Sequence, residues 1–331
     1  MGGVVSLSVT IGVTIVSWNS EAYLSSCLDS LAAQTQQPSE VVVVDNGSSD
    51  ESLRIAKSHP IVSLVDPAGE NLGFSVGQNR AIAHTDSTWV LVLNPDTRLA
   101  ADFLARMSAA INNHSEPELG TLCGKLLRMD SRLKPVEPAE IDSAGMEMFR
   151  SFRHLDRGSG HLDDGRWDTE ELVFGATGAA ALFRRSMVED LQIDGAFFDP
   201  QFFAYREDAD VAWRAQTLGW NCLYVPSAIG YHVRSVLPER RSEVGAAVNR
   251  YSVRNRFLMR WKNADKATWR HCGWRGLVRD AAVVGGCMLQ EWSSLPGLGE
   301  AFLSWPQGRR QHQWIESRRR RSSREVMEWF Q

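Results

Sequence analysis

Cysteine is scarce and scattered in this chain of 331 residues. The cysteines are odd in number and contain no CxxC pair, which argues against a disulfide framework, a zinc site and a redox centre. We expect buried free thiols at all five positions, Cys27, Cys123, Cys222, Cys272 and Cys287.

Long apolar runs are also lacking. No stretch reaches the ~18 to 20 apolar residues that a membrane span needs, and no basic residue precedes the apolar stretch at the N-terminus. That stretch continues into a motif described below, so we interpret it as a core strand and not as a signal peptide. A cytoplasmic location is predicted.

Two phosphate-binding signatures are missing. The chain has no Walker lysine motif, and no GxGxxG follows its first predicted strand, which counts against P-loop enzymes and NAD-dependent dehydrogenases. A nucleotidyltransferase would normally carry a basic, glycine-rich triphosphate loop after that strand. The segment found there, SWNSEAY, contains no lysine or arginine.

Short β-branched runs alternate with helix-like segments in the first hundred residues. Runs such as VVVV at 41–44 are typical of strands buried on both faces of a parallel sheet. We therefore predict a doubly wound, mostly parallel α/β domain with right-handed crossovers. The predicted strands are 9–17, 40–45, 62–65 and 89–93, and the predicted helices are 22–33, 51–58 and 77–84. Residues 128–171 are polar and weakly periodic, and we expect an insertion or a long loop there.

Polar residues follow each predicted strand. Turn chemistry alone explains any one of them, but in a doubly wound sheet ligands bind beyond the carboxyl ends of the strands. Because such polar residues follow every one of these strands, we predict that the carboxyl edge of the sheet binds a ligand. These residues are Ser17, Asn19, Asp45, Asn46, Asn71, Asn94 and Asp96.

Five motifs occur in a characteristic order. They are VTIVSWNSEAYLSSCLDSL at 13–31, VVVVDNGSSDES at 41–52, ENLGFSVGQNRAI at 70–82, LVLNPDTRL at 91–99 and FFAYREDADVAWRAQTLGW at 202–220. Together they resemble the family 2 glycosyltransferases of the GT-A fold over about 9–232. We accordingly divide the chain into a catalytic domain, 1–249, and a C-terminal helical extension, 250–331. Within the domain, about 9–98 would hold the nucleotide sugar and about 99–249 the acceptor.

The resemblance and the chemistry agree on the donor site. Amide and carboxylate groups suit a base and ribose. We assign nucleotide-sugar binding to Ser17, Asn19, Asp45, Asn71, Gly73, Asn79, Asn94 and Asp96. A leaving diphosphate requires charge neutralisation by a hard cation, Mg²⁺ or Mn²⁺, and Asp96 fits as a ligand. The family pattern Asp-x-Asp reads Asn94-Pro95-Asp96 here. His232 resembles the family's later metal ligand, and a structural histidine is the alternative.

The acceptor hydroxyl needs a base. Glu207, Asp208 and Asp210 cluster at the predicted start of a helix, where the helix dipole also favours acids. The resemblance assigns the base to Asp208, while Glu207 would organise the acceptor or the backbone. Arg214 would reach phosphate or lie on a solvated helix face.

The resemblance implies an inverting, metal-dependent hexosyl transfer from a nucleotide diphosphate sugar to an acceptor hydroxyl. The LNPDT variant resembles bacterial members that transfer rhamnose from dTDP-rhamnose to lipid-linked or polysaccharide acceptors. The alternatives are a nucleotidyltransferase and a non-catalytic nucleotide-sugar-binding protein.

Charge is unevenly distributed. Residues 250–331 hold 16 Lys/Arg against 7 Asp/Glu, giving +9, whereas residues 1–249 hold 20 against 33, giving −13. The basic part also contains seven of the twelve tryptophans. Tryptophan with arginine is typical of helices at an anionic membrane surface, so we predict peripheral attachment at the inner face of the plasma membrane. Homo-oligomerisation is the second interpretation, and a nucleic-acid partner is not expected.

Overall fold

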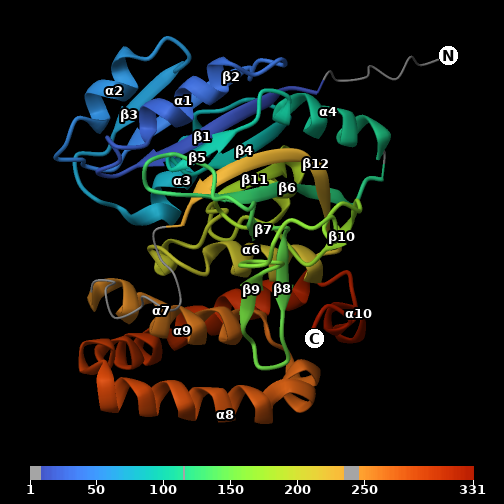
Figure 1. Cartoon of the computed structure of the whole chain (residues 1–331). Helices are drawn as coiled ribbons and strands as arrows, with labels where there is room; N and C mark the ends of the chain where they lie inside the picture. The colour runs from blue at the N-terminus through green and yellow to red at the C-terminus, as the bar shows by residue number, and fades with distance from the viewer. Residues whose placement is uncertain (1–8, 115, 235–245) are drawn as a thin grey trace.

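The computed structural model describes residues 9–114, 116–234 and 246–331, and it shows a mixed α/β body with a layer of C-terminal helices beneath it (Figure 1). Residues 1–8 and 235–245 of the predicted catalytic domain lie outside the described residues. In the first hundred residues strands and helices alternate as predicted. They are β1 (Ile11–Ser17), α1 (Leu24–Ala32), β2 (Glu40–Asp45), α2 (Ser52–Ser58), β3 (Leu64–Pro67), α3 (Gly73–Ala83) and β4 (Trp89–Leu93).

The rest of the body adds two long strands, several short ones and further helices. Its elements are β5 (Thr97–Leu99), α4 (Phe103–Asn113), β6 (Leu119–Met129), β7 (Ile141–Ser143), β8 (Met146–Met148), β9 (His154–Asp156), β10 (Glu171–Val173), β11 (Ala180–Arg184), α5 (Arg185–Asp190), the 3-10 turn η1 (Pro200–Phe202), α6 (Glu207–Thr217) and β12 (Asn221–Val233). The expectation of an insertion or loop at 128–171 was therefore wrong in part. Polar, weakly periodic segments can still form short strands when their partners come from distant parts of the chain.

The main sheet confirms the predicted fold class. Its strand order is β10-β12-β6-β11-β4-β1-β2-β3, and β1 pairs in parallel with both β2 and β4. β11 and β10 run antiparallel to their neighbours. The strand order reverses at β1, so the carboxyl ends of β1, β2 and β4 mark the edge where a ligand is expected.

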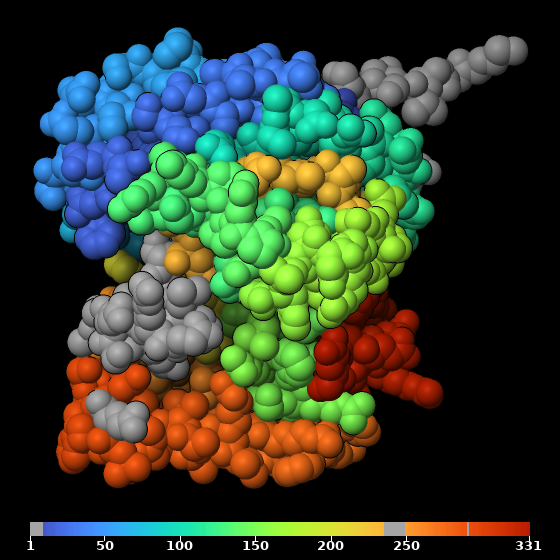
Figure 2. Space-filling model, viewed as in Figure 1, coloured from blue at the N-terminus to red at the C-terminus, as the bar shows by residue number. Residues whose placement is uncertain are grey.

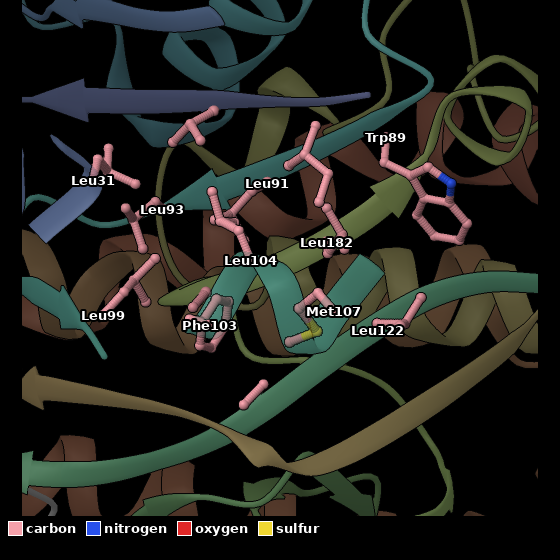
Figure 3. Close-up of a cluster of buried hydrophobic side chains, with 14 of the residues drawn as sticks. Leu31, Trp89, Leu91, Leu93, Leu99, Phe103, Leu104, Met107, Leu122 and Leu182 are labelled. Carbon is pink, nitrogen blue, oxygen red and sulfur yellow. The ribbon is translucent and has the colours of Figure 1, made fainter. Parts of the chain in front are cut away.

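The apolar pattern of the strands determines how the sheet is covered. Val41 and Val43 belong to one buried cluster and Val42 and Val44 to another, because successive side chains point to opposite faces. On one face α4 packs through residues at helical spacing. Figure 3 shows Phe103, Leu104 and Met107 of α4 close to Leu91, Leu93 and Leu182 of the sheet.

The C-terminal part is helical, as predicted, with α7 (Ala246–Asn263), α8 (Lys266–Gln290), η3 (Trp292–Ser294), α9 (Pro296–Ser317) and α10 (Ser323–Met327). It shares a buried cluster with the body, in which Trp213 of α6 and Phe152 meet Leu258 of α7 and Phe330. Within the part of the chain that the structure describes, no helix is both long and apolar enough to cross a membrane. Figure 2 shows α8, in orange, along the lower edge of the molecule.

Candidate active site

The carboxyl ends of β1 and β2 present two buried polar side chains. Ser17 and Asp45 are partners in the parallel ladder, so their side chains lie on adjacent strands. Ser17 Oγ and Asp45 Oδ1 are buried and have no hydrogen-bond partner among the residues that the structure describes. Unsatisfied buried polar atoms are costly and commonly await a ligand. The exposed Trp18 and the left-handed Asn19, with φ 48°, follow directly.

The loop before α3 is tied to the same edge. Asn71 Oδ1 accepts hydrogen bonds from Asn46 Nδ2 at 3.0 Å and from the Gly73 amide at 2.9 Å. Gly73 has φ 81°, and a Cβ there would lie 2.6 Å from the Phe203 backbone oxygen, so glycine is required for packing. Asn79 is a correction to the predicted donor site. Its amide donates to the Phe198 carbonyl at 2.7 Å and accepts from the Phe198 amide at 2.9 Å, so it has a structural role.

Asp96 and His232 lie side by side although 136 positions separate them in the sequence. β5, which begins directly after Asp96, pairs with β12 and places Thr97 opposite His232. His232 Nε2 is 3.3 Å from Asp96 Oδ1, and its Nδ1 is 2.8 Å from Asp142 Oδ2 on the buried strand β7. Burial opposes the charged imidazole, but the contacts with Asp142 and Asp96 outweigh it and raise the pKa of His232 to about 10.

These side chains fit a divalent cation. Asp96 Oδ1 is buried and faces His232 Nε2, and it accepts no hydrogen bond from the described part of the chain. A cation could replace the proton between them, and Asp142 would then orient the ring as carboxylates do for metal-bound histidines. No cluster of three or more metal-binding side chains occurs among residues 9–114, 116–234 and 246–331. The protein would thus supply only two ligands, which is usual when substrate phosphates and water complete the shell.

The predicted base lies at the start of α6. Asp208 Oδ2 accepts a hydrogen bond from the Gly178 amide at 3.2 Å, just before β11, and Oδ1 accepts from the Ala209 amide at 2.7 Å. Burial, followed by the charge of Asp156, raises the pKa of Asp208 to about 6. Burial and the neighbouring Asp208 raise the pKa of Glu207 to about 8. At neutral pH Asp208 is therefore mostly ionised, whereas Glu207 mostly retains its proton.

A cleft of about 980 Å³ extends from His232 to the start of α6. Asn94 and His232 line it at the sheet edge, Glu207 and Asp208 line it at α6, and the β8–β9 hairpin contributes Arg153. The cleft thus contains a carboxylate suited to accept a proton, Asp208, and one member of the pair suited to hold a cation, His232.

Two other charged residues of α6 are structural. Arg214 is fully buried, with its Nε 3.1 Å from Asp210 Oδ2 and its two Nη atoms bonded to the carbonyls of Leu191 and Phe197. Both predicted roles of Arg214, phosphate contact and a solvated helix face, were therefore wrong. Its spacing from Asp210 by one helical turn permits the buried pair.

Comparison with known proteins agrees with the geometry. The model of Glycosyl transferase family 2 matches residues 13–122, and that of Glycosyl transferase family group 2 matches residues 89–250. An N-acetylglucosaminyl-diphospho-decaprenol L-rhamnosyltransferase of Mycobacterium tuberculosis is 30% identical over 248 residues, which cover 66% of this chain and 75% of that relative. The chain belongs to glycosyltransferase family 2.

Two further comparisons are consistent with this family 2 glycosyltransferase. The O-antigen chain rhamnosyltransferase RfbN of Salmonella typhimurium is 25% identical over 236 residues, which cover 69% of this chain and 68% of that one. The crystal structure of GalNAc-T7 with UDP, GalNAc and Mn²⁺ matches with a TM-score of 0.61 and 14% identity, over 79% of this chain and 49% of that chain. At this identity the likeness concerns the fold alone, which is GT-A.

Sequence reasoning missed two residues near the site of this glycosyltransferase. Asp142 belongs to no motif, and only its buried contact with His232 reveals it. Trp18 lies within the first motif, but the motif sequence did not predict that this side chain would be 54% exposed at the end of a buried strand.

Proposed function

We propose that this glycosyltransferase moves rhamnose from dTDP-rhamnose, with inversion, to a hydroxyl of a lipid-linked or polysaccharide acceptor. The observation that carries the proposal is the Asp208 carboxylate in one cleft with His232, whose Nε2 faces Asp96. Both curated relatives described above are rhamnosyltransferases by name, which supports the choice of sugar. One of them is named for a sugar-diphospho-lipid acceptor, which supports a lipid-linked substrate.

Asp208 would act as the general base. It takes the proton of the acceptor hydroxyl while that oxygen bonds to the anomeric carbon and the bond from this carbon to the nucleoside diphosphate breaks. A single displacement inverts the anomeric configuration. Glu207 is unsuited to be a nucleophile because its raised pKa keeps it protonated at neutral pH, and we assign it a hydrogen bond to the acceptor.

The nucleotide would lie at the ends of β1 and β2. Asp45 Oδ1 and Ser17 Oγ are free to bind the base and ribose, and Trp18 offers an exposed aromatic face against which a base can stack. Asn19 and Asn71 shape the loops that border this edge through their bonds to the Ser49 and Gly73 amides.

Asp96 and His232 would hold Mg²⁺ or Mn²⁺, with Asn94 nearby as an uncharged neighbour. The cation neutralises charge on the leaving diphosphate when bound. The GalNAc-T7 structure with UDP and Mn²⁺ supports a divalent ion in this fold. Imidazole as a ligand modestly favours Mn²⁺.

Transfer of rhamnose from dTDP-rhamnose to a lipid-diphosphate-linked sugar tests the proposal. Product should form with Mn²⁺ or Mg²⁺ and disappear in excess EDTA. A screen of UDP-, dTDP- and GDP-sugars by thermal shift identifies the donor, because a ligand that binds only the native state stabilises it. Binding without transfer to any acceptor would support the non-catalytic alternative.

We also propose that residues 250–331 attach the protein to an anionic membrane, at the inner face of the plasma membrane. Nine of the fourteen exposed large apolar side chains of the described residues lie on α8, η3 and α9. On α8 the exposed positions recur at helical spacing and form an outward apolar stripe, while the exposed Lys266, Arg270, Arg309 and Arg310 add positive charge. Such helices bind anionic bilayers. The stripe comprises Trp274, Leu277, Val278, Met288 and Leu289, followed by Trp292, Phe302, Leu303 and Trp305.

A further inference from the structure

Four arginines line the cleft, and they differ in how their charge is balanced. Arg128 Nη1 is 3.0 Å from Glu140 Oε2, and Arg234 forms an ion pair with Asp156. These two guanidinium groups are thus neutralised within the protein. The Arg153 carbonyl, on the β8–β9 hairpin, accepts from the Phe149 amide, but its side chain makes no hydrogen bond or ion pair with any other residue that the structure describes.

Arg153 lies beside a second positive group. Its neighbour His154 lines the cleft, and Arg206 Nη1 is 3.3 Å from His154 Nδ1. Burial and the charges of Arg206, Arg256 and Arg153 hold the pKa of His154 well below its usual value. His154 is therefore neutral. Arg153 adds a guanidinium group at this end of the cleft, and Arg206 lies against His154 and near the carboxylate of Asp208.

The loop that carries Arg206 is held in an unusual conformation. Tyr205 and Arg206 have φ values of 72° and 74°, a region that non-glycine residues enter at a cost. The buried Asn255 of α7 stabilises the loop, since its Nδ2 lies 2.8 to 2.9 Å from the carbonyl oxygens of Phe202, Ala204 and Tyr205. Arg206 Nε also donates to the Ser252 carbonyl at 3.2 Å. These contacts direct the Arg206 side chain along the cleft wall.

We propose that Arg153 and Arg206 bind the diphosphate of the acceptor, a proposal that rests on the lipid-linked acceptor proposed above. A diphosphate carries several acceptor oxygens that suit the donor fork of arginine. The hydroxyls of Tyr205 and Ser252 also line this end of the cleft and can donate to it. Arg206 precedes the base Asp208 by two residues, so the attacking hydroxyl and the diphosphate of one acceptor sugar would contact the same short segment.

The donor also contains a diphosphate, but its place is at the other end of the site. Asp96 of the pair suited to a cation follows β4, which pairs with β1, so the pair and the buried oxygens of Ser17 and Asp45 belong to the carboxyl edge of the sheet. Arg153 comes from the hairpin of the acceptor half. The two diphosphates would therefore be bound by separate groups.

Binding of farnesyl diphosphate without metal, measured by calorimetry on the full chain, tests the subsite. Arg153→Ala should weaken binding about tenfold or more, as loss of a charge-assisted hydrogen bond does, and Arg153→Lys should retain part of the affinity. Arg166→Ala is the matched control, because Arg166 is exposed and pairs only with Asp164 among the described residues. dTDP binding with Mn²⁺ should be the same in all four proteins.

Three results would overturn the assignment. The first is that the wild type does not bind farnesyl diphosphate, and the second is that the wild type and Arg153→Ala bind it equally well. The third is that Arg153→Ala loses as much affinity for dTDP as for farnesyl diphosphate, which would make the subsite part of the donor site. The rhamnose-transfer assay separates the two proposals. If transfer fails while Arg153→Ala still loses farnesyl diphosphate affinity, the proposed function is wrong and the subsite stands.

Discussion

Lys262 Nζ of α7 lies 2.8 Å from Asp210 Oδ2 of α6, and both side chains are buried. The same ammonium group is 2.9 Å from Asp199 Oδ2, and Asn263 Nδ2 donates to Asp210 Oδ1 at 2.7 Å. The C-terminal helix α7 thus supports the helix whose first residues are Glu207 and Asp208. A buried network of this kind fixes position because each member depends on the others for its partners.

Lys262→Met should destabilise the protein by about 3 to 5 kcal/mol, because it leaves the buried Asp199 without its ion-pair partner and Asp210 with Arg214 as its remaining one. The free energy of unfolding, measured by urea titration, checks this. Lys266→Met is the matched control, since Lys266 is exposed at the start of α8 and should change stability little. Equal stability of the two variants would show that the network contributes nothing to folding.

Asp208→Asn should reduce kcat by roughly 10² to 10⁴, because it removes the proton acceptor and keeps the shape. Donor affinity should stay close to that of the wild type. Glu207→Gln should lose much less activity, since glutamine retains a hydrogen-bond donor where Glu207 is protonated. The comparison is made by steady-state kinetics at saturating donor. An Asp208→Asn variant with more than a third of wild-type turnover would exclude the base assignment.

Glu207 should make stability depend on pH. Its pKa is raised from 4.5 to about 8 in the folded protein, so the unfolded chain releases this proton first as pH rises. The stability associated with this group is complete below pH 4.5 and is lost progressively toward pH 8. Glu207→Gln should therefore be more stable than the wild type, by an amount that grows by roughly 2 kcal/mol or more as the pH rises from 5 to 8. Urea unfolding of both proteins at the two pH values tests whether the variant gains stability relative to the wild type as the pH rises.

Asp96→Ala should abolish the metal-dependent part of donor binding, and EDTA should have the same effect on the wild type.

Asp142→Asn should weaken Mn²⁺ affinity by about 10- to 100-fold, as loss of a carboxylate that orients a histidine ligand typically does. Titration of Mn²⁺ in the presence of dTDP measures both effects. Asp164→Asn, at an exposed position, is the control. Full transfer activity in excess EDTA would rule out the metal role.

Acidic substitutions in the apolar stripe on α8 should release the protein from membranes. Leu277→Glu with Leu289→Glu should reduce co-sedimentation with anionic vesicles, because both side chains are more than 60% exposed and neither variant disturbs the core. Wild-type binding should weaken as salt rises, with an apolar part remaining. Unchanged sedimentation of the double variant would remove the membrane proposal. If the double variant instead formed a smaller oligomer than the wild type, the stripe would be a contact between subunits.

The sequence by itself determined the parallel half of the sheet, β1 to β4, and the polar residues at its carboxyl edge. Local signals carry this information: runs such as VVVV predict a strand buried on both faces, and Ser17, Asp45 and Asp96 follow their strands directly in the chain. The start of α6 at Glu207 was predictable for the same reason, since acids gather at a helix N-terminus. These features depend on neighbours in sequence and on a fixed period.

Only the tertiary structure decided which of these side chains meet. Asp142 contacts His232, although 90 positions separate the two residues in the sequence. Arg153 and Arg206 both lie close enough to His154 to lower its pKa, although Arg153 belongs to a hairpin without a recognisable motif. The seven C-terminal tryptophans look alike in the sequence, yet Trp269 packs into the core while Trp274 is 61% exposed. Burial and pairing depend on which faces pack against each other, and that is a property of the folded chain as a whole.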